Sequence, residues 1–485
     1  MMKKEKKTDE TQKNRVWQIV IAAIYGLSFV AFFVSLILLG MLPAMYLALF
    51  GVVGIGVSAL LLKGLFSKKE GKRQLLCGII IAILSLGLIA GTSMIGGALS
   101  FFKDVAGGNV QTYDYYVVTR NDGTYKDVND IEGEQVHVLE MSGQTYETAQ
   151  KMLAEKVNVT FQSDQKLETL TEGLIQKKSN VIFLSSSHYE MAVEESEKFT
   201  KKNTQILHTI RVEVQHEKKT VNKDLTKDAF NVYISGIDTT GAITNASRSD
   251  VNMIMTVNPT DRKILLTSIP RDYHVVLSSY GAYDKLTHSG IYGIDETTET
   301  VGDLMGIDID HYVKVNFTTV TKLVDALGGI TVDSDYAFTS RDGFSYAEGE
   351  NYLNGEQALS FARERKAFAA GDNQRVKNQQ AVISGILNKA TSSTAILTQY
   401  SSILGALSEN MEISLSQKEM SSLIKMQLAD MRGWDIDSTS LKGSGSSAQV
   451  YSMPGVYVYV MEPNQESIDK AKAKIDEIMS GKTAE

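Results

Sequence analysis

Long uncharged stretches dominate the first hundred residues of the chain. No charged residue occurs between Val16 and Leu62, and about 20 apolar residues are enough for one helix to cross a bilayer. This stretch therefore predicts two spans, with the turn marked by Gly40, Leu42 and Pro43. A third uncharged stretch, residues 75–102, is long enough to span with some tilt. We expect a tail at residues 1–15 and three transmembrane helices within residues 16–102.

Basic residues flank these spans. Residues 1–15 carry a net charge of +3, and the loop 63–74 carries +4. Short basic loops stay on the cytoplasmic side of a membrane, so both segments are predicted to be cytoplasmic and residues 103–485 extracytoplasmic. A cleaved signal peptide is the alternative interpretation of the first span, but two more spans follow it and no small-residue cleavage site is present.

The next part of the chain, residues 103–215, alternates short apolar runs with helical periodicity. Residues 136–139 and 181–184 predict buried strands, and residues 145–156 and 166–177 predict helices. We expect a small accessory α/β domain here. The segment that begins at Asp130 resembles strand openings of solute-binding proteins, in which helix N-termini receive an anion; a structural spacer is the favoured alternative. Residues 216–228 are polar and without periodicity, which predicts a linker.

A second mixed pattern occupies residues 229–485. Strands are predicted at residues 230–235, 251–257, 264–269 and 329–332, and helices at residues 317–327, 355–363, 375–389 and 467–479. This mixture predicts an α/β/α sandwich, which we expect to be the catalytic domain. The fold class of the whole chain is therefore α/β, with the smaller α/β domain and three transmembrane helices in front of the sandwich.

Charge and cysteine content narrow the functional classes. The whole-chain charge of −8 leaves −15 on the exterior part once the two basic segments are set aside. Nucleic-acid binding requires a basic footprint, so that class is excluded. The single cysteine, Cys77, lies in the third span, which rules out disulfides and cysteine metal sites outside the membrane. This cysteine-free exterior suits a surface protein of a Gram-positive bacterium.

Arginines provide the main chemical signal. Five of the ten exterior arginines lie at the ends of predicted elements beside acidic or amide residues: Arg248, Arg271, Arg363, Arg365 and Arg375. Ligands bind at such ends in α/β sheets, and guanidinium groups bind bidentate anions such as a diphosphate. Arg375 and Gln379 are spaced i,i+4, so they share one helix face. Surface ion pairs are the alternative interpretation of the same residues.

Eight short motifs occur in order over about 150 residues. They are Gly236-Ile-Asp-Thr239, Ser247-Arg-Ser-Asp250, Pro270-Arg-Asp272, Asp284-Lys-Leu-Thr-His-Ser-Gly290, Leu323-Val-Asp-Ala-Leu-Gly-Gly329, Leu353-Asn-Gly-Glu-Gln-Ala-Leu359, Phe361-Ala-Arg-Glu-Arg365, and Gly371-Asp372 with Arg375 and Asn378-Gln379-Gln380. This series resembles the catalytic domains of the LytR-CpsA-Psr family. The three-span start and the extra domain resemble its capsule-cluster CpsA (Wzg) branch.

The resemblance implies a phosphotransferase. Such an enzyme moves a glycopolymer with its proximal phosphate from a polyprenyl diphosphate carrier in the membrane to peptidoglycan, in capsular polysaccharide or related wall-polymer attachment. Asp238 and Asp250 match the family's carboxylates for Mg²⁺, for which Mn²⁺ is a substitute. The diphosphate would be held by Arg248, Arg271, Arg363, Arg365, Arg375 and Gln379. The catalytic set would comprise Arg248, Arg271, Arg375 and Asp372, with Asp372 as the candidate acceptor of the proton.

Three local expectations accompany this assignment. Arg363 and Arg365 are two residues apart, so both can reach one pocket only if the helix ends near Ala362 and an irregular segment follows. His288 is expected to make a structural hydrogen bond rather than act as a base. The apolar runs at residues 251–255 and 382–387 either line a groove for the prenyl tail or form packed core, and the core is favoured.

Two other functional classes compete with the enzyme. A regulatory or attenuator role is one, but cytoplasmic segments of about 15 and 12 residues are too short for a DNA-binding domain with its own core. A non-catalytic membrane protein that senses a wall ligand through residues 103–215 is the other. Loss of polymer attachment after mutation of Asp238 or Arg365 would separate the enzyme from both.

Overall fold

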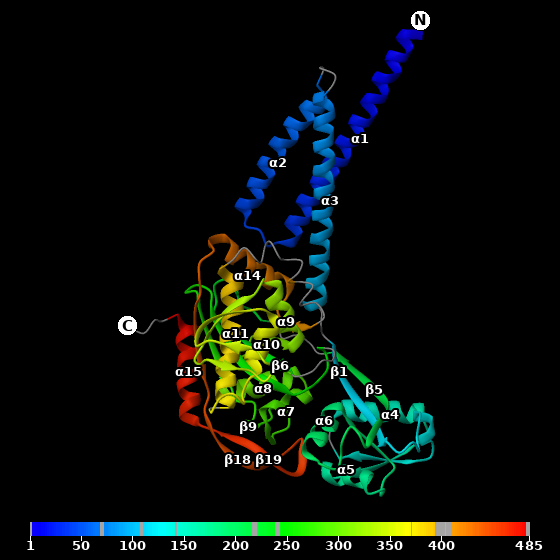
Figure 1. Cartoon of the computed structure of the whole chain (residues 1–485), viewed down its shortest axis with the longest axis vertical. Helices are drawn as coiled ribbons and strands as arrows, with labels where there is room; N and C mark the ends of the chain where they lie inside the picture. The colour runs from blue at the N-terminus through cyan, green and yellow to red at the C-terminus, as the bar shows by residue number, and fades with distance from the viewer. Residues whose placement is uncertain are drawn as a thin grey trace. The chain divides into compact units, whose positions relative to one another are not determined.

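The computed structural model describes residues 2–67, 72–106, 110–140, 143–215, 221–237, 243–369, 371–392, 403 and 410–481. The chain divides into two compact units (Figure 1). One consists of Met1–Asp104 with Ser416–Arg432, and the other of Val105–Leu415 with Gly433–Glu485.

Three long helices make up most of the first unit: α1 (Met2–Leu39), α2 (Ala44–Leu65) and α3 (Lys72–Ala106). Each is long and apolar enough to cross a membrane. Large apolar side chains on these helices face outward, and Leu27 and Leu60 are 73% and 71% exposed, as expected where lipid is the solvent. These helices confirm the three apolar spans that the sequence predicts. The unit also contains α14 (Gln417–Asp430), which begins with a capping box between Ser416 and Glu419.

The orientation of the spans is a prediction that a fusion can test. A reporter enzyme that is active only outside the membrane, fused after Ser67, is expected to be silent, because basic residues retain the loop 63–74 in the cytoplasm. The same reporter fused after Gln215 serves as the positive control and is expected to be active. Activity of the Ser67 fusion in intact cells would contradict this topology.

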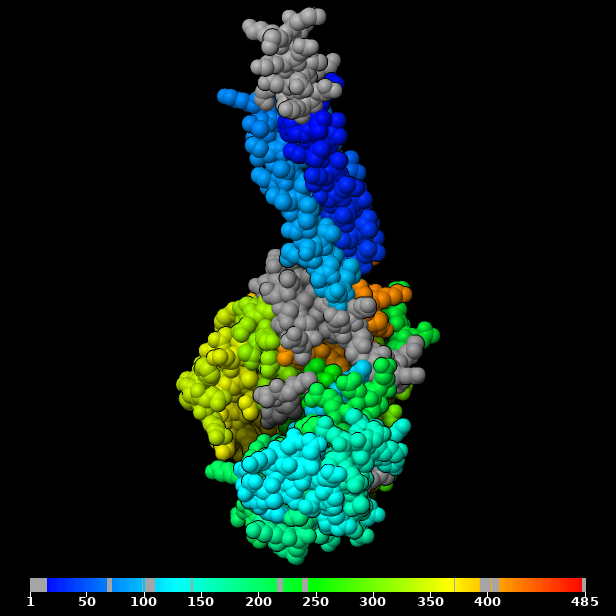
Figure 2. Space-filling model, turned by 90° about the vertical axis from the view of Figure 1, so that its right-hand side faces the viewer, coloured from blue at the N-terminus to red at the C-terminus, as the bar shows by residue number. Residues whose placement is uncertain are grey.

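In the second unit, a five-stranded sheet with the order β3-β2-β4-β1-β5 forms the accessory domain, which appears in cyan to green in Figure 2. Its strands and helices are β1 (Val110–Arg120), η1 (Val128–Ile131), β2 (Gln135–Leu139), α4 (Gln144–Lys156), β3 (Thr160–Asp164), α5 (Leu167–Ile175), β4 (Val181–Ser185), α6 (Ser186–Glu195) and β5 (Thr204–Gln215). Strand β2 is parallel to β3 and β4, whereas β1 is antiparallel to β4 and β5. The helices α4 and α6 therefore begin at the same edge of the sheet, beside a cavity of about 180 Å³.

The two faces of this sheet have different neighbours. Tyr146, Ala149 and Leu153 of α4 pack on one face within the domain. The other face, covered by α5 and α6, shares a hydrophobic core with a set of residues from the following domain: Ile291, Val450, Met453, Val458 and Val460. A separate spacer would bury its apolar residues internally, so this shared core makes the accessory domain an integral part of the second unit.

A buried histidine makes this shared core sensitive to pH. The side chain of His188 on α6 is 3% exposed, and its Nδ1 lies 2.6 Å from Oγ of Ser185. Burial lowers the pKa of His188 to about 4, from about 6.5 in an unfolded chain. The unfolded chain therefore binds the proton more readily between these pH values. Neutral His188 therefore makes its full contribution to the stability of the fold above pH ~6.5. This contribution is lost as the pH falls toward ~4, which lowers the free energy of unfolding by up to about 3 kcal/mol.

Thermal unfolding of the full chain in detergent between pH 7.5 and 4 measures this effect. The His188→Asn variant, which keeps a polar group near Ser185 but does not titrate, is expected to show a smaller drop in Tm over that interval than the unsubstituted chain. Parallel Tm curves for the two proteins would contradict the assignment to His188.

The domain that the sequence predicts to be catalytic, called the catalytic domain below, is built on a six-stranded mixed sheet with the order β16-β11-β6-β7-β8-β17. The strands are β6 (Phe230–Ile237), β7 (Ser249–Asn258), β8 (Lys263–Ile269), β11 (His311–Asn316), β16 (Met411–Ile413) and β17 (Asp435–Ser440). The helices are α7 (Leu286–Ser289), η2 (Gly290–Tyr292), α8 (Ile294–Met305), α9 (Phe317–Ala326), α10 (Gly355–Arg363), α11 (Asp372–Ser392) and α15 (Gln465–Ser480). Short pairs of strands surround this sheet: β9 (His274–Val276) with β10 (Tyr283–Lys285), β12 (Ile330–Ser334) with β15 (Gly349–Leu353), β13 (Phe338–Thr339) with β14 (Ser345–Tyr346), and β18 (Gly443–Val450) with β19 (Met453–Pro463).

Helices cover both faces of the six-stranded sheet. Residues of α8 and α15, such as Val301 and Ile475, pack with Leu265 in one core cluster. On the other face, Gln380 of α11 donates a hydrogen bond of 2.6 Å to the carbonyl oxygen of Thr439 in β17. This arrangement confirms the predicted α/β/α sandwich.

The predicted apolar groove is mostly core. Ile254 and Val382 are buried and belong to two different hydrophobic clusters, whereas Val251 of the first run lines a cavity described below. Strand β5 ends at Gln215 and β6 begins at Phe230, while residues 216–220 of the predicted linker lie outside the described residues.

Candidate active site

A cavity of about 470 Å³ lies at one edge of the catalytic sheet. Its lining contains six cationic and three anionic side chains, together with four others. They are Arg271, Arg341, Arg363, Arg365, Lys366 and Arg375; Asp250, Asp342 and Glu364; and Val251, Phe317, Ser360 and Gln379. This excess of positive charge makes the cavity, called the donor cavity below, suited to a multiply charged anion.

Asp250 and Arg271 meet because of strand register. Asn252 of β7 pairs with Ile269 of the antiparallel strand β8, so the start of β7 and the end of β8 lie at the same edge. The carboxylate Oδ1 of Asp250 accepts hydrogen bonds from Nη1 of Arg271 at 2.8 Å and from Oγ1 of Thr287 at 3.2 Å. Burial alone would lower the pKa of Arg271, but the carboxylates of Asp250 and Asp272 raise it above its usual value. Arg271 is therefore a permanent cation at the wall of the cavity.

Arg363 and Arg365 reach the same cavity from the end of α10. The helix begins with a capping box between Asn354 and Gln357 and ends at Arg363, which confirms the predicted range 355–363 and the end expected near Ala362. Glu364 then adopts an extended conformation, with φ −69° and ψ 130°. The irregular segment that the sequence predicts is thus present, and both arginines line the cavity. The guanidinium of Arg363 also stacks over the Phe317 ring, 4.3 Å from its centroid.

Glu364 holds this irregular segment in place. Its side chain accepts hydrogen bonds from the backbone N–H groups of Arg341, Lys366 and Ala367, at 2.7, 2.7 and 3.0 Å. Burial raises the pKa of the carboxyl, yet these backbone donors outweigh burial and leave the pKa below its ordinary value. A charged Glu364 therefore fixes the chain on which the two neighbouring arginines are carried.

Helix α11 contributes Arg375 and Gln379, which both line the donor cavity as their i,i+4 spacing predicts. The helix starts at Asp372, three residues before its predicted start, and an acidic residue there stabilises the first turn. Nη2 of Arg375 lies 2.6 Å from Oδ1 of Asp372. Burial lowers the pKa of Arg375, Asp372 opposes this effect, and repulsion from Arg271 adds to it.

Two buried guanidinium nitrogens in this cavity make no hydrogen bond within the described part of the chain. They are the Nε atoms of Arg271 and Arg375, and Nε of Arg271 lies 3.7 Å from Oδ2 of Asp272, an ion pair without a hydrogen bond. A buried donor without an acceptor costs free energy, so the cavity is built to receive acceptor atoms from a ligand. Phosphate oxygens would supply them.

Arg248 is directed elsewhere. It does not belong to the lining of the donor cavity but to that of a neighbouring cavity of about 320 Å³. Its Nη1 and Nη2 lie 2.6 and 2.7 Å from the two carboxylate oxygens of Glu194, a residue of the accessory domain. Of the remaining predicted residues, Asp238 falls within residues 238–242, outside the described residues, and Asp372 lines neither of these two cavities.

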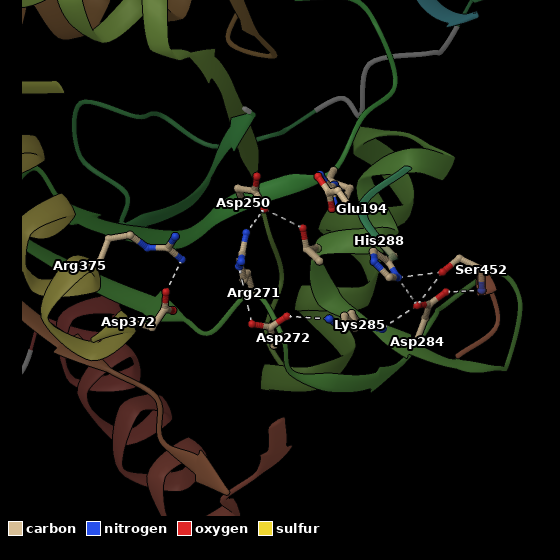
Figure 3. A network of polar contacts seen from close by, with 12 residues as sticks. Glu194, Asp250, Arg271, Asp272, Asp284, Lys285, His288, Asp372, Arg375 and Ser452 are labelled. Atoms are coloured by element: carbon tan, nitrogen blue, oxygen red, sulfur yellow. Dashed lines mark hydrogen bonds and ion pairs between the residues drawn. The ribbon is translucent and has the colours of Figure 1, made fainter. Parts of the chain in front are cut away.

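A second polar network lies beside this site (Figure 3). Nδ1 of His288 lies 2.8 Å from Oδ1 of Asp284 and 2.8 Å from Oγ of Ser452, and the backbone N–H of Ser452 donates to Oδ2 of Asp284 at 2.8 Å. His288 and Asp284 are 3% and 0% exposed. These bonds tie α7 to the β18–β19 hairpin, which supports the structural hydrogen bond expected for His288.

Sequence reasoning missed several lining residues. Lys366 follows Arg365 directly, and Arg341 belongs to an Arg-Asp-Gly turn, so a wider search for basic residues near turns would have found both. Glu194 has no comparable signal, because nothing local in α6 distinguishes it from the glutamates beside it. Asp250 is the only predicted metal ligand within the described residues, which contain no cluster of three or more histidine, cysteine, aspartate or glutamate side chains suited to a metal.

The structure is an α/β/α sandwich with a cavity of converging guanidinium groups at its sheet edge, an arrangement suited to an anionic ligand. The family model described as "LytR_cpsA_psr family" matches residues 183–476. The chain belongs to the LytR-CpsA-Psr family.

Two relatives support this membership by their sequence identity. The chain is 35% identical over 245 residues to "Polyisoprenyl-teichoic acid--peptidoglycan teichoic acid transferase TagU" of Bacillus subtilis (strain 168), covering 48% of this chain and 73% of the relative. It is 38% identical over 210 residues to the protein of the same name from Enterococcus faecalis (strain ATCC 700802 / V583), covering 43% of this chain and 68% of the relative. The crystal structure of B. subtilis TagU aligns with a TM-score of 0.41 and 31% identity, over 53% of this chain and 100% of that chain.

Proposed function

We propose that this chain is a phosphotransferase that moves a glycopolymer, with its proximal phosphate, from a polyprenyl diphosphate carrier to peptidoglycan. The observation that carries the proposal is the convergence of Arg271, Arg363, Arg365 and Arg375 on one cavity, where two buried Nε atoms make no hydrogen bond within the described residues. Relatives named as transferases of polyisoprenyl-linked teichoic acid to peptidoglycan support the same substrate class.

The reaction is a single displacement at phosphorus. A hydroxyl oxygen of the peptidoglycan sugar forms a bond to the phosphorus that carries the glycopolymer. The bond from this phosphorus to the bridging oxygen breaks, and polyprenyl phosphate leaves with the electron pair. The hydroxyl proton passes to a carboxylate, for which Asp372 stays the candidate from sequence; this carboxylate lies 2.6 Å from Nη2 of Arg375.

Positively charged side chains are the main catalytic groups in such a reaction. Phosphoryl transfer needs little covalent help from the protein, so alignment and neutralisation of charge lower the barrier. Arg271 and Arg375 would hold the diphosphate from the sheet edge and from α11, while Arg363 and Arg365 would hold it from the end of α10. Four guanidiniums from three separate segments fix both position and orientation of the phosphates.

A divalent cation completes the proposed site. Asp250 and Asp238 would hold Mg²⁺, or Mn²⁺ in its place, because one or two carboxylates leave room for phosphate oxygens around the ion. Asp250 fits this role in that it is a carboxylate at the wall of the cationic cavity. The ion would neutralise charge on the diphosphate.

The polymer is proposed to be a capsular polysaccharide or a related wall glycan, and the cell a Gram-positive bacterium. Support comes from the three apolar helices and the additional domain before the sandwich, the arrangement that resembles the capsule-cluster branch. The membrane helices would anchor the chain in the bilayer that carries lipid-linked donors, and residues 103–485 would face outward.

A reconstituted assay tests the function. The full chain in lipid nanodiscs, given a polyprenyl diphosphate-linked oligosaccharide, uncross-linked peptidoglycan strands and Mg²⁺, is expected to release polyprenyl phosphate and to label the strands. Mass spectrometry of the labelled strands should show the glycan joined through one phosphate. Release without a phosphodiester product would indicate simple hydrolysis and contradict the proposed transfer.

A further inference from the structure

The cavity that contains Arg248 is built by both domains of the second unit. Helix α6 of the accessory domain supplies Met191, Glu194 and Glu195. The catalytic domain supplies Arg248, Asp250, Arg271, Asp272, Lys285, Thr287, His288, Arg365, Met453 and Val458. The cavity, called the side cavity below, measures about 320 Å³.

The side cavity adjoins the donor cavity. Asp250, Arg271 and Arg365 line both of them, so a ligand in either cavity reaches the same three side chains. Figure 3 shows Asp250 and Arg271 between two groups: Arg375 and Asp372 on one side, and Glu194 and Lys285 on the other. A transfer reaction needs two substrates that meet at one phosphorus, and two cavities with a common wall provide this geometry.

Charge distinguishes the two cavities. The donor cavity has six cationic side chains against three anionic ones, whereas the side cavity has four of each. The latter cations are Arg248, Arg271, Lys285 and Arg365, and the anions are Glu194, Glu195, Asp250 and Asp272. A balanced set of charged donors and acceptors suits a neutral molecule with many hydroxyl groups, since each hydroxyl both donates and accepts. Met191, Met453 and Val458 offer an apolar patch for the C–H face of a sugar ring.

Glu194 fixes the orientation of Arg248 in this wall. Both carboxylate oxygens engage the guanidinium, at 2.6 and 2.7 Å, and the Arg248 side chain is 26% exposed. The hydrogen-bonded guanidinium lowers the pKa of Glu194, so this carboxylate stays charged. A planar bidentate pair holds both partners in one geometry, which a single-point contact does not.

The chain before Arg248 is attached to the accessory domain. The backbone N–H of Thr112 in β1 donates to the carbonyl oxygen of Thr244 at 3.0 Å, and the N–H of Ala246 donates to the carbonyl oxygen of Thr112 at 2.8 Å. On the other side, Gly290 lies so close to this segment that a Cβ atom there would collide with the carbonyl oxygen of Ser247. The backbone around Arg248 is thus held from both domains, independently of its side chain.

We propose that the side cavity is the acceptor subsite, which binds a sugar of the peptidoglycan strand, and that Glu194 is a positioning residue that aligns Arg248 along it. The proposal rests on the proposed function and names the place of its second substrate. The accessory domain then completes the active site, because one wall of the acceptor subsite belongs to α6. An acceptor sugar in this cavity has its hydroxyl next to Asp250, Arg271 and Arg365, where the donor phosphates are held.

Steady-state kinetics of the full chain in nanodiscs test this assignment. The Glu194→Gln variant keeps the size of the side chain but loses the charged bidentate pair. It is expected to raise KM for uncross-linked peptidoglycan strands about tenfold, with KM for the lipid-linked oligosaccharide within about twofold. The matched control is Glu190→Gln on the same helix. Glu190 pairs with Lys201 at 2.8 Å and lines neither cavity, so its loss is expected to leave both KM values unchanged.

Other outcomes would overturn the proposal. A lower KM for the donor, or faster transfer by Glu194→Gln, would mean that Glu194 blocks Arg248 from the diphosphate instead of serving the acceptor. If Glu194→Gln has the same KM values and turnover as the unsubstituted chain and only its Tm is lower, the Glu194–Arg248 pair has a structural role. Isothermal titration calorimetry of the strands without donor separates the acceptor subsite from the proposed function, because it needs no transfer. If the unsubstituted chain fails to catalyse transfer, weaker strand binding by Glu194→Gln still supports the subsite. Equal strand binding by the two proteins overturns it.

Discussion

Replacement of Asp250 by alanine is expected to reduce transfer by at least about 10²-fold, the usual loss when a preorganised charged group is removed from a reacting centre. Asp250 lies where the donor cavity and the side cavity meet, bonds to Arg271 and Thr287, and is the described member of the proposed metal pair. Its loss would remove one of the two proposed ligands for the cation and the 2.8 Å contact that helps to hold Arg271. Release of polyprenyl phosphate by the variant in nanodiscs measures the effect.

Controls separate chemistry from folding in this experiment. Asp333→Ala removes an exposed aspartate of β12 in the same domain and is expected to keep full activity. The Tm of Asp250→Ala should stay within a few degrees of that of the unsubstituted chain. Titration with Mg²⁺ gives a second readout, since loss of a ligand shifts activation to higher Mg²⁺ concentrations. Full activity of Asp250→Ala, with unchanged Mg²⁺ dependence, would refute the metal assignment.

The substitution Arg365→Lys is expected to weaken binding of a polyprenyl diphosphate substrate at least roughly tenfold, the equivalent of one charge-assisted hydrogen bond of about 1.5 to 3 kcal/mol. Lysine keeps the positive charge but lacks the planar fork that engages two phosphate oxygens at once. Arg365 lines both cavities, so its fork lies where donor and acceptor meet. The measurement is a titration of the full-length variant and the unsubstituted chain in nanodiscs with the polyprenyl diphosphate substrate, in which affinity and turnover are compared.

A matched control exists in the accessory domain. Arg211 contacts Asp114 through Nε at 2.8 Å and Nη2 at 3.1 Å, and it lines neither the donor cavity nor the side cavity. Arg211→Lys therefore loses a bidentate pair of the same kind and is expected to bind the substrate normally. Equal binding by Arg365→Lys and the unsubstituted chain would make Arg365 a surface charge and leave the anion site to the other arginines.

Local sequence patterns determined most of the framework. Uncharged runs longer than a bilayer is thick predicted the three apolar helices, because length and polarity alone decide whether a helix can span. Period-2 and period-3.6 patterns located strands such as β7 and β8 and helices such as α10. The residues at their ends were thereby located too, which is why Arg271, Arg363, Arg365, Arg375 and Gln379 were predicted together and line one cavity.

Tertiary packing decided what each charged side chain contacts. Arg248 occurs in the same kind of motif as Arg271, yet it faces Glu194, which lies 54 positions earlier in the chain and in another domain. No local period encodes such a pair, because it depends on α6 packing against the catalytic domain through a core built from both. The position of Arg341 also depends on a tertiary contact, because its backbone N–H donates a hydrogen bond to the buried Glu364 beside the donor cavity. Secondary structure follows from neighbours along the chain, whereas the partner of a charged group follows from the surfaces that burial of apolar residues brings together.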